Sequence, residues 1–283
     1  MAFWIWKLEP GDQPNSLRAI HLQRGTETLD CISENLPSGV YTTLRTYHHN
    51  QTLAFERHIQ RLEQSAALAG SACKLDAERL RAALRRGLSE IPDEQEVRLR
   101  LTLDLEQTPG AVYIAAEGLQ SPTPSDYSTG VKAITLELER RIPGAKLTEF
   151  ISQARQAREN LAEGVNEAIL VDSGGRMLEG LSSNFFAIKD GEIFTAGESV
   201  LPGITRSLAL EVIDGLKIPI HLQAVCIDQL SSLQETFITS SSRGVLPVVE
   251  IDHTRIGSRR PGQLTSTIMA GYRALIDEWI ETI

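Results

Sequence analysis

The chain has 283 residues, of which 41% are hydrophobic and 23% charged, so it is long enough for one large or two mid-sized globular domains. Its 28 basic and 37 acidic residues give a formal net charge of −9, which argues against nucleic-acid binding, because phosphate backbones are bound by concentrated Lys and Arg. No apolar run approaches the roughly 18 residues that a membrane helix requires, so we expect no membrane segment.

The cysteines and the N-terminus indicate a cytoplasmic protein. Cys31, Cys73 and Cys226 are odd in number and lack CxxC spacing, as expected of reduced thiols rather than of a disulfide framework or a zinc site. The opening apolar run ends at Lys7 and Glu9 and is too short for a signal peptide. Six histidines without HxxxH or HExxH spacing argue against a metal site.

The first half of the chain predicts strands and helices. Residues 97–105 alternate apolar with polar side chains, which is typical of a strand buried on one face. Asp76 is placed to cap the helix that follows it. The stretch 120–125 is polar and broken by prolines, so we place a domain boundary there. In chain order, the predicted elements are strands at 40–46 and 53–55, helices at 59–69 and 75–91, and strands at 97–105 and 112–116.

The second half mixes helices and strands without a regular βαβ repeat, which favours an α+β protein of two domains. Asp190 and Gly191 are a hairpin signal between two of its strands, and Gly164 is placed to end its first helix. The predicted strands are 131–138, 167–171, 184–189, 193–195, 218–222, 236–239 and 245–251, and the predicted helices are 147–162, 205–213 and 263–283.

Three features of this half combine into one chemistry. Lys146 supplies an amine, Glu179 a carboxylate, and residues 201–206 a turn at the start of a helix, where backbone N–H groups favour an anion. Taken singly, each has an ordinary explanation: a solvated lysine at a helix start, an exposed turn glutamate and a simple N-cap. Together they match what an aldehyde cofactor that carries a phosphate requires.

Six runs of the chain resemble those of the class IV aminotransferases, the group that contains branched-chain and D-amino-acid aminotransferases and aminodeoxychorismate lyase. They follow the order and spacing of that family from about Gly39 to the C-terminus, at residues 39–45, 58–62, 166–172, 178–185, 201–206 and 247–252. The resemblance implies pyridoxal 5'-phosphate as the cofactor and an α+β fold of two domains, of the D-amino-acid aminotransferase type. It also implies a homodimer with sites near the subunit boundary.

The domain limits expected from the pattern and the resemblance are 1–120 for a smaller N-terminal domain, 121–130 for a linker and 131–283 for a larger cofactor-binding domain. The resemblance places Lys146 as the lysine that bonds covalently to the aldehyde of the cofactor and later moves a proton. It places Glu179 against the ring nitrogen, where a carboxylate keeps that nitrogen protonated.

The phosphate of the cofactor is assigned to a second group of residues. The N–H groups of Gly203, Ile204 and Thr205 precede a helix, and the Thr205 hydroxyl adds a donor. Arg61 adds a charge-assisted pair, and Ser241 matches the position of a hydroxyl that the family uses against the same phosphate. Alone, Arg61 would more often be a solvated helix arginine, and Ser241 plain loop.

The chain departs from the family pattern at positions that bear on the substrate. Ile151 and Leu36 stand where many members have tyrosines, and Thr42 replaces a familiar glutamate. Thr43 resembles the lyase, in which a threonine at this position assists proton transfer. His58, just before Arg61, is expected to satisfy backbone groups rather than to take part in catalysis.

The leading hypothesis is a transaminase that moves an amino group between an amino acid and a 2-keto acid, with Lys146 as general base. The alternative enzyme is aminodeoxychorismate lyase, which releases pyruvate and 4-aminobenzoate. A relative that binds the cofactor without turnover is a third hypothesis, and the presence of Lys146, Glu179 and Arg61 together counts against it.

Overall fold

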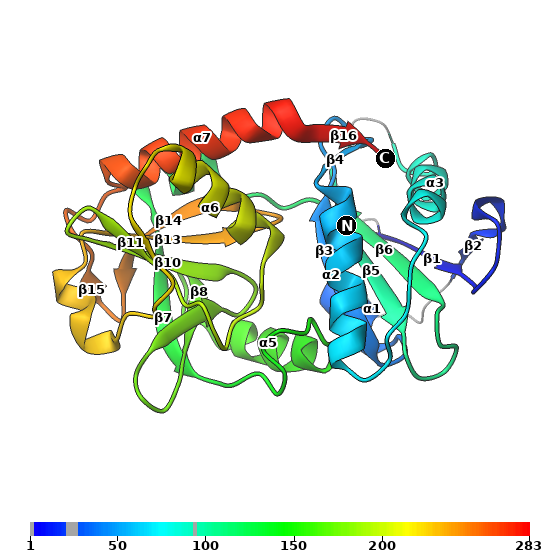
Figure 1. The fold of residues 1–283 in the computed structure, drawn as a ribbon, viewed down its shortest axis with the longest axis horizontal. Helices are drawn as coiled ribbons and strands as arrows, with labels where there is room; N and C mark the ends of the chain where they lie inside the picture. The colour runs from blue at the N-terminus through cyan, green and yellow to red at the C-terminus, as the bar shows by residue number, and fades with distance from the viewer. Residues whose placement is uncertain (1–2, 21–27, 93–94) are drawn as a thin grey trace. The chain divides into compact units, whose positions relative to one another are not determined.

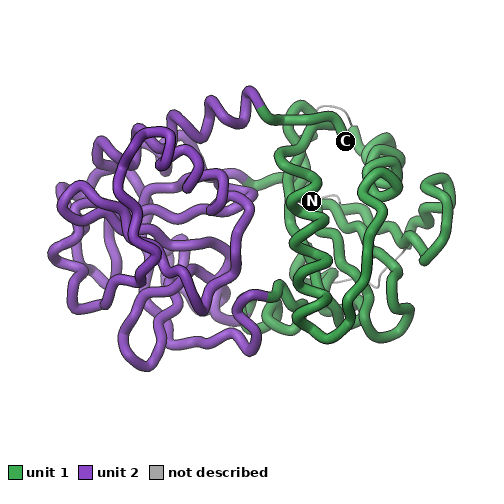
Figure 2. The backbone as a smooth tube through the Cα atoms, in the orientation of Figure 1, with its two compact units in different colours: residues 1–120, 145–155, 279–283 green, residues 121–144, 156–278 purple. Residues whose placement is uncertain are grey.

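The computed structural model describes residues 3–20, 28–92 and 95–283. Its contacts divide the chain into two compact units (Figure 2). Unit 1 consists of Met1–Gln120, Ala145–Arg155 and Trp279–Ile283, and unit 2 of Ser121–Gly144 and Gln156–Glu278. Among the described residues, no helix has both the length and the apolar character needed to cross a membrane.

The sequence placed a linker at 121–130, whereas this segment belongs to unit 2 and contains helix α4 (Pro124–Thr129). The helix lacks an apolar stripe and is held by its own N-terminus. The hydroxyl of Thr123 accepts a hydrogen bond from the N–H of Asp126, and the Asp126 carboxylate accepts one from the N–H of Thr123. Such a capping box can stabilise a short helix that has no hydrophobic periodicity. Because the prediction relied on apolar periodicity, it did not find α4.

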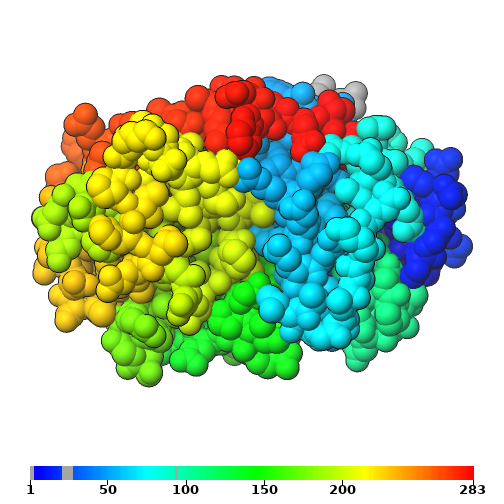
Figure 3. Space-filling model, viewed as in Figure 1, coloured from blue at the N-terminus to red at the C-terminus, as the bar shows by residue number. Residues whose placement is uncertain are grey.

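Unit 1 is built on an antiparallel sheet that helices cover on both faces (Figure 1). In spatial order its strands are β2 (Arg18–Ala19), β1 (Phe3–Leu8), β6 (Val112–Gly118), β5 (Val97–Asp104) and β3 (Gly39–Arg45). Its helical segments are η1 (Pro14–Ser16), α1 (Leu29–Glu34), α2 (Phe55–Leu68), α3 (Ala77–Leu88) and the start of α5 (Glu149–Glu159). The outer side of α2 and α3 faces the reader in light blue and cyan in the space-filling view (Figure 3).

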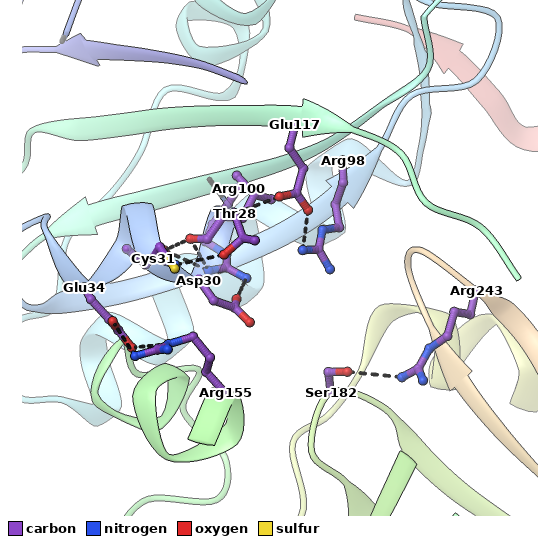
Figure 4. A network of polar contacts seen from close by, with 12 residues as sticks. Thr28, Asp30, Cys31, Glu34, Arg98, Arg100, Glu117, Arg155, Ser182 and Arg243 are labelled. Atoms are coloured by element: carbon purple, nitrogen blue, oxygen red, sulfur yellow. Dashed lines mark hydrogen bonds and ion pairs between the residues drawn. The ribbon is translucent and has the colours of Figure 1, made fainter. Parts of the chain in front are cut away.

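Strand β5 was predicted to be buried on one face, and it is buried on both. Its apolar side chains point into the core, while Arg100 on the opposite face meets α1. The Arg100 guanidinium pairs with Asp30 at 2.8 Å (Figure 4). It also donates to the Ser33 hydroxyl at 2.7 Å. Arg98 pairs with Glu117, whose carboxylate also accepts the N–H of Leu29. The polar face of β5 is therefore covered by α1, a helix that the periodicity did not indicate.

Two predicted boundaries in unit 1 are wrong. The strand predicted at 53–55 is β4 (Gln51–Leu53), and α2 already begins at Phe55 because Ala54 takes a left-handed conformation with φ 54°. The helix predicted to run to 283 is α7 (Gln263–Trp279), followed by strand β16 (Ile280–Thr282) paired with β4. Pairing with β4 and the complete burial of Ile283 outweigh continuation of the helix. The strongly periodic elements are confirmed, among them α3 with its Asp76 cap.

Unit 2 is a barrel with additional strands. Each strand pairs with the next in the spatial order β10, β13, β14, β7, β8, β9. Strand β9 also pairs with β10, which closes the ring. Strands β11 and β12 extend the sheet beside β10, and β15 pairs with β14. Their bounds are β7 (Val131–Glu137), β8 (Val165–Val171), β9 (Met177–Gly180), β10 (Asn184–Lys189), β11 (Glu192–Phe194), β12 (Ile220–His221), β13 (Glu235–Ser240), β14 (Gly244–Ile251) and β15 (Thr254–Arg255).

Apolar side chains from the inner faces of these strands fill the barrel, including Ile169, Phe185 and Ile238, each at most 2% exposed. Helix α6 (Ile204–Gly215) lies on β13 and β14, and η2 (Ile227–Ser232) follows β12 along the chain. Strand β9 was not predicted, although it carries Glu179. Its four residues are all buried, so they show no alternation of polar and apolar side chains that a pattern would detect.

Candidate active site

Lys146 in unit 1 is held by its backbone on two sides. It lies three residues before α5, outside any helix. Its carbonyl accepts the N–H of Tyr41 on β3 at 2.9 Å, and its N–H donates to the Ser65 hydroxyl of α2 at 3.1 Å. The residue is only 9% exposed, so the lysine is not a solvated residue at a helix start. Burial and two backbone anchors give its amine a defined direction.

That direction is toward an aromatic ring. The Nζ atom of Lys146 lies 4.7 Å from the centroid of the Tyr41 ring, and the guanidinium carbon of Arg100 lies 4.8 Å from the same centroid. Tyr41 is 7% exposed and therefore a largely desolvated partner for both cations. We did not predict a role for Tyr41. The alternation of β3 is a signal that would have found it, because Tyr41 and the candidate Thr43 share one face of the strand.

Arg61 belongs to a second face of unit 1, formed by α2 and the other side of β3. His58, Arg61 and Ser65 are spaced by three and four residues, so they share one face of the helix. Nη2 of Arg61 donates to the Thr42 hydroxyl at 2.7 Å, and the residue is only 5% exposed. Burial lowers the pKa of Arg61 to about 10, with Tyr41 acting in the opposite direction, so the group remains charged at neutral pH.

Within the described residues, Nε of Arg61 has no hydrogen-bond partner and no carboxylate pairs with the guanidinium. A buried charge without a partner is costly, since desolvation is not offset by a counter-charge. The arrangement therefore fits an anion supplied by a ligand. Arg61 is not the solvated helix arginine that its position alone would suggest.

Within the described residues, the His58 side chain contacts a hydroxyl rather than the backbone groups that the sequence led us to expect. Its Nδ1 lies 2.8 Å from the Thr42 hydroxyl, in a fully buried pair. Burial, followed by the charges of Arg61 and Lys146, lowers the pKa of His58 well below its usual value. The ring is therefore neutral at physiological pH, and Thr42 contacts both His58 and Arg61.

Glu179 in unit 2 is buried and contacted on both carboxylate oxygens. It is 2% exposed, which excludes an exposed turn glutamate. Oε2 accepts the N–H of Leu201 at 3.1 Å and Nδ2 of Asn184 at 3.3 Å. Oε1 lies 2.7 Å from Nε of Arg140, whose side chain is 6% exposed. We predicted that residues 182–184 orient this carboxylate, and Asn184 does so. Arg140, outside every periodic pattern, was missed.

The two neighbours of Asn184 bond elsewhere. Ser183 donates to Glu167 at 2.9 Å, and Ser182 accepts from Arg243 at 3.1 Å (Figure 4). Arg243 also pairs with Glu167 at 2.6 Å. Glu167 thus ties the turn that follows Glu179 to the turn between β13 and β14, which carries Ser241.

The N-terminus of α6 is the anion-binding feature of unit 2. Gly203 is its N-cap and provides no side-chain hydrogen bond to the first turn, and Ile204 and Thr205 are buried. The first N–H groups of a helix have no partner within it, so this end favours an anion. A Cβ atom on Gly203 would come 2.1 Å from Oδ1 of Asn184, which explains the glycine. Asn184 also donates to the Leu201 carbonyl at 2.8 Å, joining this turn to Glu179.

Arg206 adds a cation to the same turn. Nη2 donates to the Ala196 carbonyl at 2.9 Å, while Nε has no hydrogen-bond partner among the residues that the structure describes. Burial lowers the pKa of Arg206, and the Glu179 carboxylate opposes this shift. We assigned no role to Arg206, although it closes the run 201–206.

The structure thus brings Lys146 and Arg61 to β3 and α2 in unit 1, and Glu179 and Gly203–Thr205 together in unit 2. Thr43 and Ser241 are half-buried. Neither of their side chains makes a hydrogen bond within residues 3–20, 28–92 and 95–283. They remain candidates by position: Thr43 on the Tyr41 face of β3, and Ser241 in the turn beside Arg243.

The comparisons with known proteins agree on one family. The family model described as amino-transferase class IV matches residues 39–251 of the chain. A probable branched-chain-amino-acid aminotransferase of Thermotoga maritima is 28% identical over 260 residues, covering 88% of this chain and 92% of its own length. The D-alanine aminotransferase of Bacillus licheniformis is 30% identical over 262 residues, covering 87% and 90%.

A solved structure shares the fold. The T.th. branched-chain amino acid aminotransferase with pyridoxamine 5'-phosphate superposes with a TM-score of 0.79 at 21% identity, covering 100% of this chain and 99% of that chain. The predicted fold class and family are confirmed. Because the family model spans most of the chain, the protein belongs to the class IV aminotransferases.

Proposed function

We infer that this aminotransferase uses pyridoxal 5'-phosphate to move an amino group between an amino acid and a 2-keto acid. The observation that carries the proposal is Lys146, a buried lysine anchored by β3 and α2 with its amine against the Tyr41 ring. The cofactor, when bound, supplies a ring that withdraws electrons from the α-carbon of the substrate. The charged, unpaired Nε of Arg61 and the uncapped start of α6 both fit its phosphate.

In this proposal Lys146 holds the cofactor covalently and then moves the proton at the α-carbon of the substrate as a general base. Tyr41 holds the amine over its ring and limits its motion. Thr43, on the same face of β3, is proposed to assist that proton transfer through its hydroxyl.

Glu179 is proposed to accept the hydrogen bond of the ring nitrogen. A carboxylate performs this role only while ionised, and the neighbouring Arg140 cation and the N–H of Leu201 both favour the ionised form. Asn184 fixes the orientation of the carboxylate through Oε2.

The phosphate is proposed to bind Arg61, the N–H groups of Gly203, Ile204 and Thr205, and the hydroxyls of Thr205 and Ser241. A guanidinium and a helix N-terminus both stabilise a dianion through charge-assisted hydrogen bonds. Thr205 is 4% exposed and Arg61 is 5% exposed, so both groups are largely withdrawn from bulk water.

The amino acid itself is best approached through the relatives. The matched proteins include a branched-chain-amino-acid aminotransferase and a D-alanine aminotransferase, so both L-branched-chain amino acids and D-alanine are the first substrates to test. The matched family model and these relatives are aminotransferases and do not favour the lyase, which only Thr43 resembles. As the family resemblance implied, we also propose that the protein is a homodimer in the cytoplasm. Size-exclusion chromatography with light scattering measures the oligomeric state.

The decisive experiment is the half-reaction. Purified protein with the cofactor is mixed with L-valine, L-leucine, L-isoleucine or D-alanine, and the absorption spectrum is followed for conversion of the cofactor from its aldehyde to its amine form. Lys146→Ala should abolish the borohydride-sensitive absorption band and lower turnover by about 10²- to 10⁴-fold, the range of a lost general base. Unchanged absorption in that variant overturns the assignment of the lysine.

A further inference from the structure

Thr42 is the centre of a buried chain of hydrogen bonds in unit 1. Its hydroxyl lies 2.7 Å from Nη2 of Arg61 and 2.8 Å from Nδ1 of His58. The three residues are 0%, 5% and 3% exposed, so water does not screen these contacts. His58 and Arg61 are one turn apart on α2, and Thr42 faces them from β3.

The chemistry of the groups fixes the direction of the hydrogen bond to Arg61, and the tautomer of His58 sets the direction of the other. A guanidinium has donors only, so the Thr42 oxygen accepts from Arg61. Thr42 has one proton of its own to donate, and we assign the neutral His58 the tautomer in which Nδ1 is unprotonated and accepts it. The lone pairs of Thr42 are then turned toward Arg61, and one rotamer of the guanidinium is favoured.

The surroundings of the Arg61 guanidinium are unusual for a buried arginine, because they are neutral. Thr42, which accepts from Nη2 of Arg61, and His58, which contacts Thr42, are both neutral, and within the described residues no carboxylate pairs with the guanidinium. A hydroxyl orients a guanidinium without cancelling its charge, whereas an acidic side chain would do both. Nε of Arg61 has no hydrogen-bond partner among the described residues.

We propose that Thr42 and His58 are positioning residues that hold the Arg61 guanidinium with neutral groups and reserve its charge for the phosphate of the cofactor. This inference rests on the proposed function, because it takes Arg61 as a phosphate ligand. The hydroxyl of Thr42 acts directly on Arg61, and the imidazole of His58 acts through Thr42.

The proposal is tested by comparing two cofactor forms. Apo-protein is titrated with pyridoxal 5'-phosphate and with pyridoxal, which has the same aldehyde and lacks the phosphate, and dissociation constants are read from absorption. Thr42→Val keeps the volume and removes the hydroxyl. We expect it to weaken binding of the phosphate form by about 10- to 100-fold, the range for a lost hydrogen bond to a charged group, and to leave pyridoxal binding unchanged. Thr42→Ser should restore binding.

His58 has its own pair of variants. His58→Leu removes the acceptor and should weaken the phosphate form in the same direction as Thr42→Val, whereas His58→Asn keeps an acceptor on the side chain and should lose less. Thr52→Val is the matched control. Thr52 is a fully buried threonine of the same unit, and its hydroxyl bonds the Arg45 carbonyl, so its loss affects folding but not the phosphate.

Arg61→Gln distinguishes the role of Arg61 as a phosphate ligand from the role of Thr42 as its positioning residue. If this variant binds both cofactor forms as the wild type does, Arg61 is not a phosphate ligand and the proposed function loses that assignment. If it loses preference for the phosphate form while Thr42→Val keeps it, the positioning role alone is overturned. In the double variant Thr42→Val/Arg61→Gln, we expect no further loss beyond Arg61→Gln, because Thr42 acts through Arg61. An additive loss contradicts the proposal.

Discussion

The buried pair of Arg140 and Glu179 allows a quantitative test of the unit 2 site. Oε1 of Glu179 lies 2.7 Å from Nε of Arg140, and the two side chains are 3% and 6% exposed. Removing one member of a buried pair costs about 3–5 kcal/mol, because the other charge stays desolvated. Leu201 and Asn184 still donate to Oε2, so we expect Arg140→Met to lower the free energy of unfolding by about 3 kcal/mol, the lower end of that range.

A double-mutant cycle assigns the loss to the pair. Glu179→Gln alone leaves the Arg140 guanidinium buried without its carboxylate, whereas Arg140→Met/Glu179→Gln removes both charges. We expect the double variant to lose at least about 2 kcal/mol less than the sum of the single losses, as is typical of groups in contact.

The assay must report on unit 2. Trp4, Trp6 and Trp279 are the three tryptophans of the chain and all belong to unit 1, so their fluorescence follows the wrong unit. Urea unfolding of the apo-protein, followed by amide hydrogen exchange of β9 and β10, measures the relevant equilibrium. An Arg140→Met variant within about 0.5 kcal/mol of the wild type, or strictly additive single losses, would refute the reasoning.

Two further predictions concern the two sets of site residues. Gly203→Ala places a methyl group 2.1 Å from Oδ1 of Asn184, so the amide must move away from Glu179 and Leu201; we expect a loss of about 1–3 kcal/mol in thermal unfolding, and an unchanged melting temperature would contradict this packing. The lowered pKa of buried His58 means that the unfolded chain binds more protons below the usual histidine pKa of 6.5, so stability falls as the pH drops below that value, by at most about 1.4 kcal/mol per pH unit. His58→Asn should flatten this part of the stability–pH profile, measured by urea unfolding between pH 8 and 5, and an equally steep profile would show that another group titrates.

The local elements of this protein are largely determined by sequence. Helix α3 has a clear apolar stripe and the Asp76 cap, and the Asp190–Gly191 turn takes positive φ angles of 53° and 79°, as the hairpin signal predicts. These features depend on neighbours within a few residues. The same is true of the start of α6, because the sequence alone indicates both Gly203 and the helix that follows it.

Elements that depend on distant partners were not predictable in this way. Strand β16 exists because residues 280–282 pair with β4, more than two hundred positions earlier, and β9 has no exposed face because both of its sides are covered. Helix α1 covers the polar face of β5, so the alternation of β5 correctly indicated a strand and wrongly indicated an exposed side.

The candidate site likewise has features that the sequence determined and features that depend on the tertiary structure. The sequence by itself determined the types of group that the chemistry needs, the amine of Lys146, the carboxylate of Glu179 and the glycine turn before α6, because the kind of side chain and its spacing are properties of the chain. Only the tertiary structure decided their surroundings: the Tyr41 ring against Lys146, Arg140 beside Glu179 and the neutral Thr42 and His58 beside Arg61. Such contacts join residues far apart in the chain, and burial there sets which charges are paired and which remain available to a ligand.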